Sequence, residues 1–449
     1  MIVPRPFSED ARQFVHVAMG TLALSLRYLT AVEAMVLAST ALAFNVYALR
    51  RVAGHLYRPH ESRHRLLSGI TLYPLAIVLL LLALPNRRDI VAAAWGVLAF
   101  GDGMATIAGR YVRSPRIPWN PDKSVAGSAA FVLFGGASAS FLCWWCAPTV
   151  VPPAYLWFSL WMPVLAAIVA AAIETIPIKL DDNISVPAAA AAVLWATSLI
   201  SEDLVVSLGV AASGTLPLAL AANVGVAGAG YAARTVTRTG ALCGAALGTA
   251  IAVTAGWGGW ALLLATFAVA VVTSRLGLRR KTLLGIAEER GGRRGAGNAI
   301  ANTGVAAAAA VMGALSYAQD AAHIAFVAAL AAGGSDTVAS EIGKAWGRRT
   351  FLVPTFRPVT PGTSGAISVE GTAAGLAGAV ALAALGVACG LVPSRTLPAI
   401  VAAATIGSFA ESALGATLEG PGVLNNDVLN FLNTAIAAAV AILLVDVFR

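Results

Sequence analysis

Long apolar runs alternate along the chain with short segments that hold most of its charged residues. Leu66–Pro85, Ser124–Ile173, Gly240–Ser274 and Val428–Val445 contain no charged residue. A helix needs about 20 mostly apolar residues to cross the hydrocarbon core of a bilayer. Counting spans on this basis predicts an all-α polytopic membrane protein with roughly 14 transmembrane helices.

The composition agrees with lipid as the solvent of many side chains. Hydrophobic residues make up 58% of the 449 positions and charged residues 12%, whereas a soluble domain has about 25% charged residues. The net charge of +8 comes from basic clusters within Arg50–Arg65, Arg110–Lys123, Arg275–Arg294 and Lys344–Arg357. The positive-inside rule places such clusters in cytoplasmic loops, so this charge does not indicate nucleic-acid binding.

The cysteine pair and the N-terminal charges both have structural explanations. Cys143 and Cys146 lie within an apolar run, and we interpret them as small apolar residues of a transmembrane helix. Glu9, Asp10 and Arg12 precede the first apolar run. We therefore interpret the N-terminus as a short interfacial segment and not as a signal peptide.

Polar motifs recur in the same order in the two halves of the chain. Asp102 and Asp336 stand beside glycines 234 positions apart. Further matches follow at offsets of 234 to 244; they pair Gly109-Arg110 with Gly343-Lys344, Lys123–Ser128 with Ile367–Thr372, Glu174 with Glu411, and Asp181–Asn183 with Asn425–Asp427. Because both copies keep their basic loops on one side, the pattern predicts parallel repeats, with residues 1–200 and 201–449 as two domains.

Acidic residues at membrane depth are candidates for chemistry, because a charge in lipid is costly. Asp102 and Asp336 lie at the ends of apolar runs, and Glu174 and Glu411 lie within or at the ends of others. A single such acid could form an interhelical salt bridge or lie at headgroup level. Recurrence beside glycines favours a binding site, because glycine lets the backbone approach a ligand closely.

Groups suited to phosphate accompany these acids. Pro361–Ser368 combines glycines and hydroxyls before a predicted helix, which is typical of an anion-binding loop, although a tight turn would have the same composition. Gly291–Arg294 offers guanidinium groups that match phosphate oxygens, or a solvated basic loop. Together these groups predict a Mg²⁺–polyphosphate site for phosphoryl transfer. The sequence has no Walker A or protein-kinase motif and no histidine pair with zinc spacing.

The same residues resemble two related membrane families. The first half resembles the dolichol kinase and phytol kinase family through Gly101–Ala105, Gly109-Arg110, Lys123–Ser128 and Glu174–Pro187. The second half resembles a sister family that includes the plant phytyl-phosphate kinase through Gly291–Arg294, Gly334–Lys344, Pro361–Gly371 and Glu411–Asp427. The resemblance implies a CTP-type nucleotide donor and kinship with CDP-diacylglycerol synthases. Ala126 departs from the pattern, since family members carry Glu there and the second half keeps Glu370.

From these observations and the resemblance we hypothesise a bifunctional isoprenoid alcohol kinase. The first half would phosphorylate a prenol such as phytol, geranylgeraniol or farnesol, and the second half would convert the monophosphate to the diphosphate. Mg²⁺ and CTP, or another nucleoside triphosphate, would be required. The expected location is the bacterial inner membrane, with lipid as partner and both sites facing the cytoplasm. The oligomeric state does not follow from the sequence.

The predicted site residues have three roles. The catalytic residues are Asp102, Lys123, Asp182, Asp336, Glu370 and Asp427. The nucleotide-binding residues are Gly101, Gly103, Arg110, Ser124, Asn183, Arg293, Arg294, Lys344, Thr363, Ser364 and Ser368. The metal ligands are Asp102, Glu174, Asp181, Asp336, Glu341 and Glu411.

Two other functions fit the same motifs. A cytidylyltransferase that makes a CDP-lipid would also bind a nucleotide and a metal ion. A transporter could use parallel repeats and intramembrane acids. The acids of a transporter should lie near the bilayer midplane, whereas these motifs lie at span ends and in loops on one side.

Overall fold

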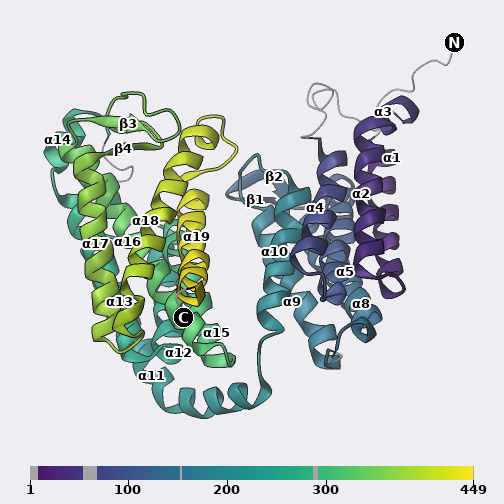
Figure 1. Ribbon diagram of the computed structural model, residues 1–449, viewed down its shortest axis with the longest axis horizontal. Helices are drawn as coiled ribbons and strands as arrows, with labels where there is room; N and C mark the ends of the chain where they lie inside the picture. The colour runs from purple at the N-terminus through teal and green to yellow at the C-terminus, as the bar shows by residue number, and fades with distance from the viewer. Residues whose placement is uncertain (1–8, 54–67, 152–153, 287–291, 448–449) are drawn as a thin grey trace. The chain divides into compact units, whose positions relative to one another are not determined.

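The computed structural model describes residues 9–53, 68–151, 154–286 and 292–447. The chain divides into two compact units, Met1–Ser198 and Leu199–Arg449 (Figure 1). Most of the basic cluster expected at Arg50–Arg65 lies outside the described residues, as does Gly291.

Unit 1 is a helical bundle with one short hairpin. Its helices and helical turns are α1 (Glu9–Gly20), η1 (Thr21–Arg27), α2 (Ala31–Tyr47), α3 (Leu49–Val52), α4 (Gly69–Ala83), α5 (Arg88–Gly96), η4 (Val97–Asp102), α6 (Gly103–Tyr111), α7 (Val125–Ala130), η5 (Phe131–Gly135), α8 (Gly136–Cys146), η6 (Ala147–Thr149), α9 (Leu156–Glu174) and α10 (Asp182–Thr197). Strands β1 (Arg116–Ile117) and β2 (Asn120–Ser124) pair antiparallel between α6 and α7.

Unit 2 has a similar composition of elements. Its helices and helical turns are α11 (Glu202–Ala232), α12 (Arg238–Thr254), α13 (Gly256–Arg275), α14 (Leu278–Leu283), α15 (Ala296–Leu315), α16 (Gln319–Trp346), α17 (Val369–Ala388), η8 (Ser394–Thr396), α18 (Leu397–Leu414), η9 (Gly415–Glu419) and α19 (Asn426–Val447). Strands β3 (Thr350–Leu352) and β4 (Ala366–Ser368) pair antiparallel between α16 and α17.

Each unit is organised around one buried helix that leads to a repeated aspartate. In unit 1, residues 90–94 of α5 are fully buried, and the continuous helix reaches Asp102 through η4. In unit 2, residues 326–332 of α16 are fully buried, and Asp336 follows one turn later. Alanine is the commonest residue in both stretches, because small residues let helix backbones approach closely where lipid supplies no hydrophobic driving force.

The two hairpins end in equivalent helix caps. Ser124 Oγ accepts a hydrogen bond of 3.1 Å from the N–H of Gly127, and Ser368 Oγ accepts one of 3.0 Å from the N–H of Gly371. A side-chain oxygen at this position satisfies a backbone donor of the first helical turn. The repeat seen in the sequence is therefore also a repeat of local structure, and the longer β3–β4 connection accounts for the change in offset from 234 to 244.

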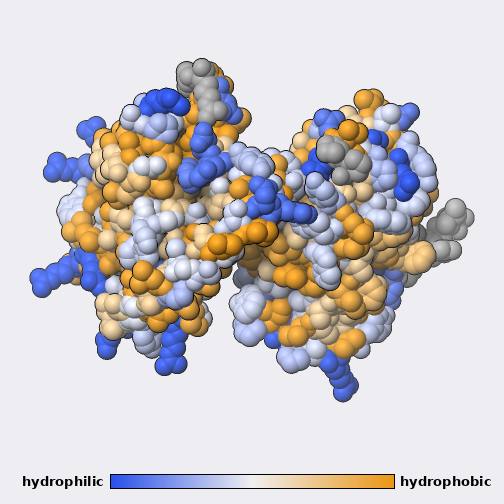
Figure 2. Space-filling view, turned by 90° about the horizontal axis from the view of Figure 1, so that it is seen from below, coloured by the Kyte–Doolittle hydropathy of each residue, from blue (hydrophilic) through white to orange (hydrophobic). Residues whose placement is uncertain are grey.

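The all-α polytopic architecture is confirmed. Among the described residues, ten helices are long and apolar enough to cross a membrane, and Ala31–Tyr47 and Gly69–Ala83 are shorter apolar helices. Helices such as α10 and α12, of 16 and 17 residues, are also shorter than the about 20 residues of a full span. Apolar side chains cover much of the visible surface of each unit (Figure 2).

Close packing at Gly371 provides a test of the α16–α17 contact. A Cβ atom at Gly371 would lie 2.5 Å from the Ala339 carbonyl oxygen, so Gly371→Ala forces the helices apart. We expect a loss of about 1–3 kcal/mol and a lower melting temperature of the purified protein in detergent. Gly214→Ala in α11 is the control, because no atom lies within 4 Å of its Cβ position. Equal melting temperatures of the two variants would contradict the packing.

Candidate functional site

Unit 1 brings together three carboxylates that are far apart in the sequence. Asp102 ends η4, Glu174 ends α9 and Asp182 begins α10. One oxygen from each of these three side chains lies within 4.8 Å of the others. Because two of the three residues stand at helix ends, the group lies at one end of the bundle and not halfway along its helices.

Lys123 enters this group from the hairpin. Its Nζ atom lies 2.5 Å from Glu174 Oε1 and 3.1 Å from Asp182 Oδ2. Burial by itself lowers the pKa of Lys123, but the carboxylates of Asp182 and Glu174 outweigh that effect and raise the pKa above its usual value. The lysine is therefore a charged counterion within the acidic group.

Asp181 and Asn183 extend the site beside Asp182. Asp181 Oδ1 caps α10 by accepting a hydrogen bond of 2.9 Å from the N–H of Asn183, and it accepts another from Asn183 Nδ2 at 2.6 Å. Asn183 Oδ1 is buried and has no hydrogen-bond partner among the described residues. A buried oxygen without a donor is costly, so this atom is a candidate to contact a bound cation.

The residues present fit a divalent cation. Opposite ligands of an octahedral Mg²⁺ lie about 4.2 Å apart, because each bond is about 2.1 Å long. The oxygens from Asp102, Glu174 and Asp182 all lie within 4.8 Å of one another, so a shared ion requires only a small adjustment. Carboxylate and amide oxygens are also the ligand type that such hard cations prefer.

Helix α1 forms a wall of this site. His16 Nε2 lies 3.6 Å from Asp102 Oδ2. Arg12, Asn183 and Asp181 all lie close to Gly69. A Cβ atom at Gly69 would be 2.8 Å from Arg12 Nη2, 3.0 Å from Asn183 Nδ2 and 3.3 Å from Asp181 Oδ2. Neither His16 nor Arg12 belongs to a motif that recurs in the second half, so the repeat could not reveal them.

Several predicted nucleotide-binding residues of unit 1 have other contacts. Arg110 Nη1 forms an exposed ion pair of 2.8 Å with Asp10 of α1, outside the acidic group. Gly101 and Gly103 lie in continuous helix, and their Cβ positions would contact Phe131 at 3.1 Å and Val17 at 2.5 Å. These glycines therefore permit close helix packing, and their role in approaching a ligand stays a prediction.

The acids of unit 2 are arranged differently. Asp336 Oδ1 accepts a hydrogen bond of 3.2 Å from Ser408 Oγ of α18, which also carries Glu411. Among the described residues, the only group of three acidic side chains close enough to share one ion is the one in unit 1. The predicted three-ligand set of Asp336, Glu341 and Glu411 is therefore not assembled in unit 2.

Glu341 instead lies between two lysines. Its Oε2 atom is 2.5 Å from Lys281 Nζ and its Oε1 atom is 3.0 Å from Lys344 Nζ. The Lys281 and Glu341 side chains are each 2% exposed. Sequence reasoning missed Lys281 as a site residue, because it stands among other basic residues of a loop, and nothing in that pattern marks the one that is buried.

The remaining predicted residues of unit 2 mostly bond within loops and caps. Ser364 Oγ donates to Glu419 Oε2, and Thr363 Oγ1 donates to the Thr360 carbonyl at 2.8 Å. The N–H of Arg348 donates to Glu370 Oε2 at 3.3 Å. Ser368 caps α17, and Arg294 faces the Ala270 carbonyl and Ser274. Asp427 packs against Gly297, and Arg293 precedes α15.

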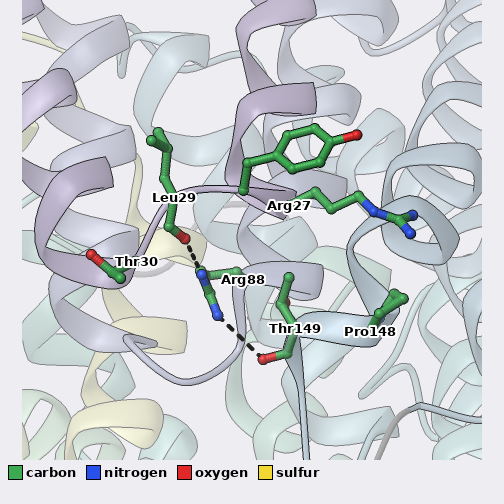
Figure 3. Close-up of a pocket in the computed structure, with 7 residues that line it drawn as sticks. Arg27, Leu29, Thr30, Arg88, Pro148 and Thr149 are labelled. Atoms are coloured by element: carbon green, nitrogen blue, oxygen red, sulfur yellow. Dashed lines mark hydrogen bonds between the residues drawn. The ribbon is translucent and has the colours of Figure 1, made fainter.

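A pocket of about 400 Å³ lies elsewhere in unit 1, lined by Arg27, Tyr28, Leu29, Thr30, Arg88, Pro148 and Thr149 (Figure 3). The Arg88 guanidinium donates to the Leu29 carbonyl and, at 3.4 Å, to the Thr149 carbonyl. It therefore ties together the starts of α2 and α5 and the end of η6. Arg88 begins the continuous helix whose later part carries Asp102, so this pocket is separate from the acidic group.

Comparisons with known proteins identify relatives of the chain. Residues 221–438, within unit 2, match the family described as integral membrane protein DUF92. The uncharacterized membrane protein sll0875 of Synechocystis sp. is 41% identical over 201 residues, covering 44% of this chain and 77% of that protein. Protein VTE6 of Arabidopsis thaliana is 36% identical over 197 residues, covering 42% and 59%. Phytol kinase 1 of Arabidopsis thaliana is 33% identical over 126 residues, covering 28% and 41%. No solved structure matches the chain.

The fold and the polar groups define a polytopic all-α integral membrane protein with a partly buried acidic site. The chain belongs to the DUF92 family of integral membrane proteins. Its relatives include protein VTE6 and phytol kinases, although the matched segment spans less than two thirds of VTE6 and less than half of phytol kinase 1. The fusion of two related families inferred from the motifs stays a prediction.

Lys123 and a bound cation should compete for the same carboxylates. Lys123→Met removes the counterion of Glu174 and Asp182. We expect the free energy of unfolding to fall by about 2–3 kcal/mol. Breaking a fully buried pair costs about 3–5 kcal/mol, and the loss is smaller here because the lysine side chain is 28% exposed. Added Mg²⁺ should raise the melting temperature of this variant more than that of the wild type. Lys179→Met, at an exposed lysine, is the control. An equal Mg²⁺ response of all three proteins would argue against the cation site.

The buried Lys281–Glu341 pair can be tested by a double-mutant cycle. Lys281→Met should destabilise the protein by about 3–5 kcal/mol, because Glu341 then lacks one of its two cations. The double variant Lys281→Met, Glu341→Leu should recover part of this loss, because no uncompensated carboxylate remains. Melting temperatures in detergent measure both effects, with Arg280→Met on the exposed face of α14 as control. Additive losses would show that the two side chains are not coupled.

Proposed function

We propose that this protein is a membrane-embedded phosphotransferase that phosphorylates an isoprenoid alcohol or its monophosphate. The observation that carries the proposal is the group of Asp102, Glu174 and Asp182 with Lys123 at the ends of apolar helices. A site at the end of the helices is open to a water-soluble nucleotide and to a lipid alcohol whose hydroxyl lies at the membrane interface. Similarity to proteins named phytol kinase supports this class of substrate.

The chemistry of phosphoryl transfer suits this set of side chains. The reaction depends mostly on positioning and on neutralising phosphate charge. Asp102, Glu174 and Asp182 would hold Mg²⁺, which when bound draws charge from the phosphate oxygens. Lys123 would contact the phosphate whose charge increases during transfer, because it is the cation already inside the group.

The nucleotide donor and the reaction catalysed by each unit are further parts of this proposal. CTP would be the donor, unit 1 would act on the alcohol, and unit 2 would act on the monophosphate. In unit 2, Asp336 and Glu411 would be the acids of the site, beside Ser408. Lys344 and Lys281 would balance the charge of Glu341. Both sites would face the cytoplasm of a bacterial inner membrane, as the basic loops beside them favour.

One labelling assay tests the activity and the division of work. The full-length protein in detergent, given Mg²⁺, a prenol and CTP labelled at the γ-phosphate, should produce labelled monophosphate and diphosphate. Asp102→Asn should reduce alcohol phosphorylation about 100-fold or more, and Asp336→Asn should let the monophosphate accumulate. Asp122→Asn, at an exposed aspartate of the hairpin, is the control.

Other outcomes of the same assay point elsewhere. Transfer of label from the α-phosphate of CTP into a lipid would identify a cytidylyltransferase. Uptake of a solute by vesicles containing the protein, without any phosphorylated product from CTP, UTP or ATP, would identify a transporter and overturn the kinase proposal.

A further inference from the structure

We infer that His16 of α1 is a positioning residue of the unit 1 site, where it holds the Asp102 carboxylate in the orientation that faces Glu174 and Asp182. The inference rests on the proposed function only in that Asp102 is taken as a ligand of the catalytic cation. It assigns to an N-terminal helix a direct part in the site.

The contacts of the imidazole define its protonation. His16 Nε2 lies 3.1 Å from the Leu98 carbonyl oxygen and 3.6 Å from Asp102 Oδ2. A carbonyl oxygen can only accept a hydrogen bond, so Nε2 carries the proton. The same N–H group faces the carboxylate, which favours one position of the Asp102 side chain.

The local helix geometry explains why a side chain from another helix can bond here. Leu98 and Asp102 both lie in η4, a π-helical turn. Such turns interrupt the regular hydrogen-bond ladder, often beside functional residues, and let a side chain enter it. By bonding Leu98 and facing Asp102, His16 links the backbone of the turn to the carboxylate that the turn presents.

Asp102 needs this contact because its acidic neighbours repel it. Glu174 and Asp182 carry the same charge within 4.8 Å, and the Lys123 ammonium bonds those two carboxylates. His16 places a ring nitrogen of α1 3.6 Å from Asp102 Oδ2. Without it, repulsion would turn Asp102 away from the position where three oxygens meet.

His16 is itself held in place by two buried aromatic residues. The Tyr73 ring packs edge-on against the imidazole, with centroids 4.8 Å apart and planes at 78°. Tyr73 Oη donates to the His16 carbonyl at 3.4 Å and accepts a hydrogen bond of 2.8 Å from Trp95 Nε1. Contacts of Gly20 with Ala99 and Phe100 hold the following turn of α1 against η4.

Binding of Mn²⁺ to the full-length protein in detergent tests the inference without any substrate. The free Mn²⁺ signal in electron paramagnetic resonance gives the dissociation constant. We expect His16→Leu to weaken Mn²⁺ binding about 10- to 100-fold, as for other residues that orient metal ligands. His16→Gln, which keeps an N–H donor, should restore most of the affinity. Val15→Ala, at a half-exposed residue of the same helix, should bind as the wild type does.

Kinetics provide the second measurement. His16→Leu should raise the KM for Mg²⁺ more than it lowers kcat, because the residue acts through a ligand and not on the phosphate. Tyr73→Phe, which keeps the ring and removes both hydrogen bonds, should show a smaller change of the same kind. Tyr73→Phe also allows the role of His16 to be tested if His16→Leu does not fold.

Two results would overturn the inference. One is wild-type Mn²⁺ affinity in folded His16→Leu, or in Tyr73→Phe if His16→Leu does not fold. The other is a His16→Gln variant as impaired as His16→Leu with an equal drop in melting temperature, since that pattern indicates packing alone. If the wild type binds Mn²⁺ in a manner that depends on His16 but phosphorylates no prenol, the proposed function fails and the inference stands.

Discussion

A carboxylate buried among the helices of a membrane protein must be balanced where it lies, because an unpaired charge away from water costs several kcal/mol. In unit 1, Lys123 balances Glu174 and Asp182. In unit 2, Lys281 and Lys344 balance Glu341. The hairpin before α7 and the short helix α14 bring two of these lysines to the acids. The short segments between the long helices are therefore as important to the polar sites as the long helices themselves.

The two units use one local scaffold with two charge arrangements. Both place a capping serine after a hairpin and a glycine one turn later, against the helix that carries the repeated aspartate. The residue before the capping serine is Lys123 in unit 1 and Ile367 in unit 2. This one difference removes the central cation from the second hairpin, and the cations of unit 2 come from α14 and α16 instead. Related backbones therefore present distinct chemistry.

Much of the architecture and part of the site could be predicted from the sequence. Apolar runs and missing charges predict polytopic helices, and the recurrence of Asp102 and Glu174 as Asp336 and Glu411 predicts which acids belong to polar sites. His16 and Lys281 could not be found in this way. Each stands at a position without a counterpart in the other half, and the contact that gives it a role joins it to a residue 86 or 60 positions away.

Sequence alone determined the membrane environment, the repeat and the residue types available for a phosphate or a cation, because these depend on composition and order. Tertiary structure decided which of those residues meet. It brought Asp102, Glu174, Asp182 and Lys123 together and left Arg110 at the surface with Asp10. The physical reason is that helix packing sets distances of a few ångströms between side chains, and hydropathy and spacing along the chain do not specify which faces of two distant helices come into contact.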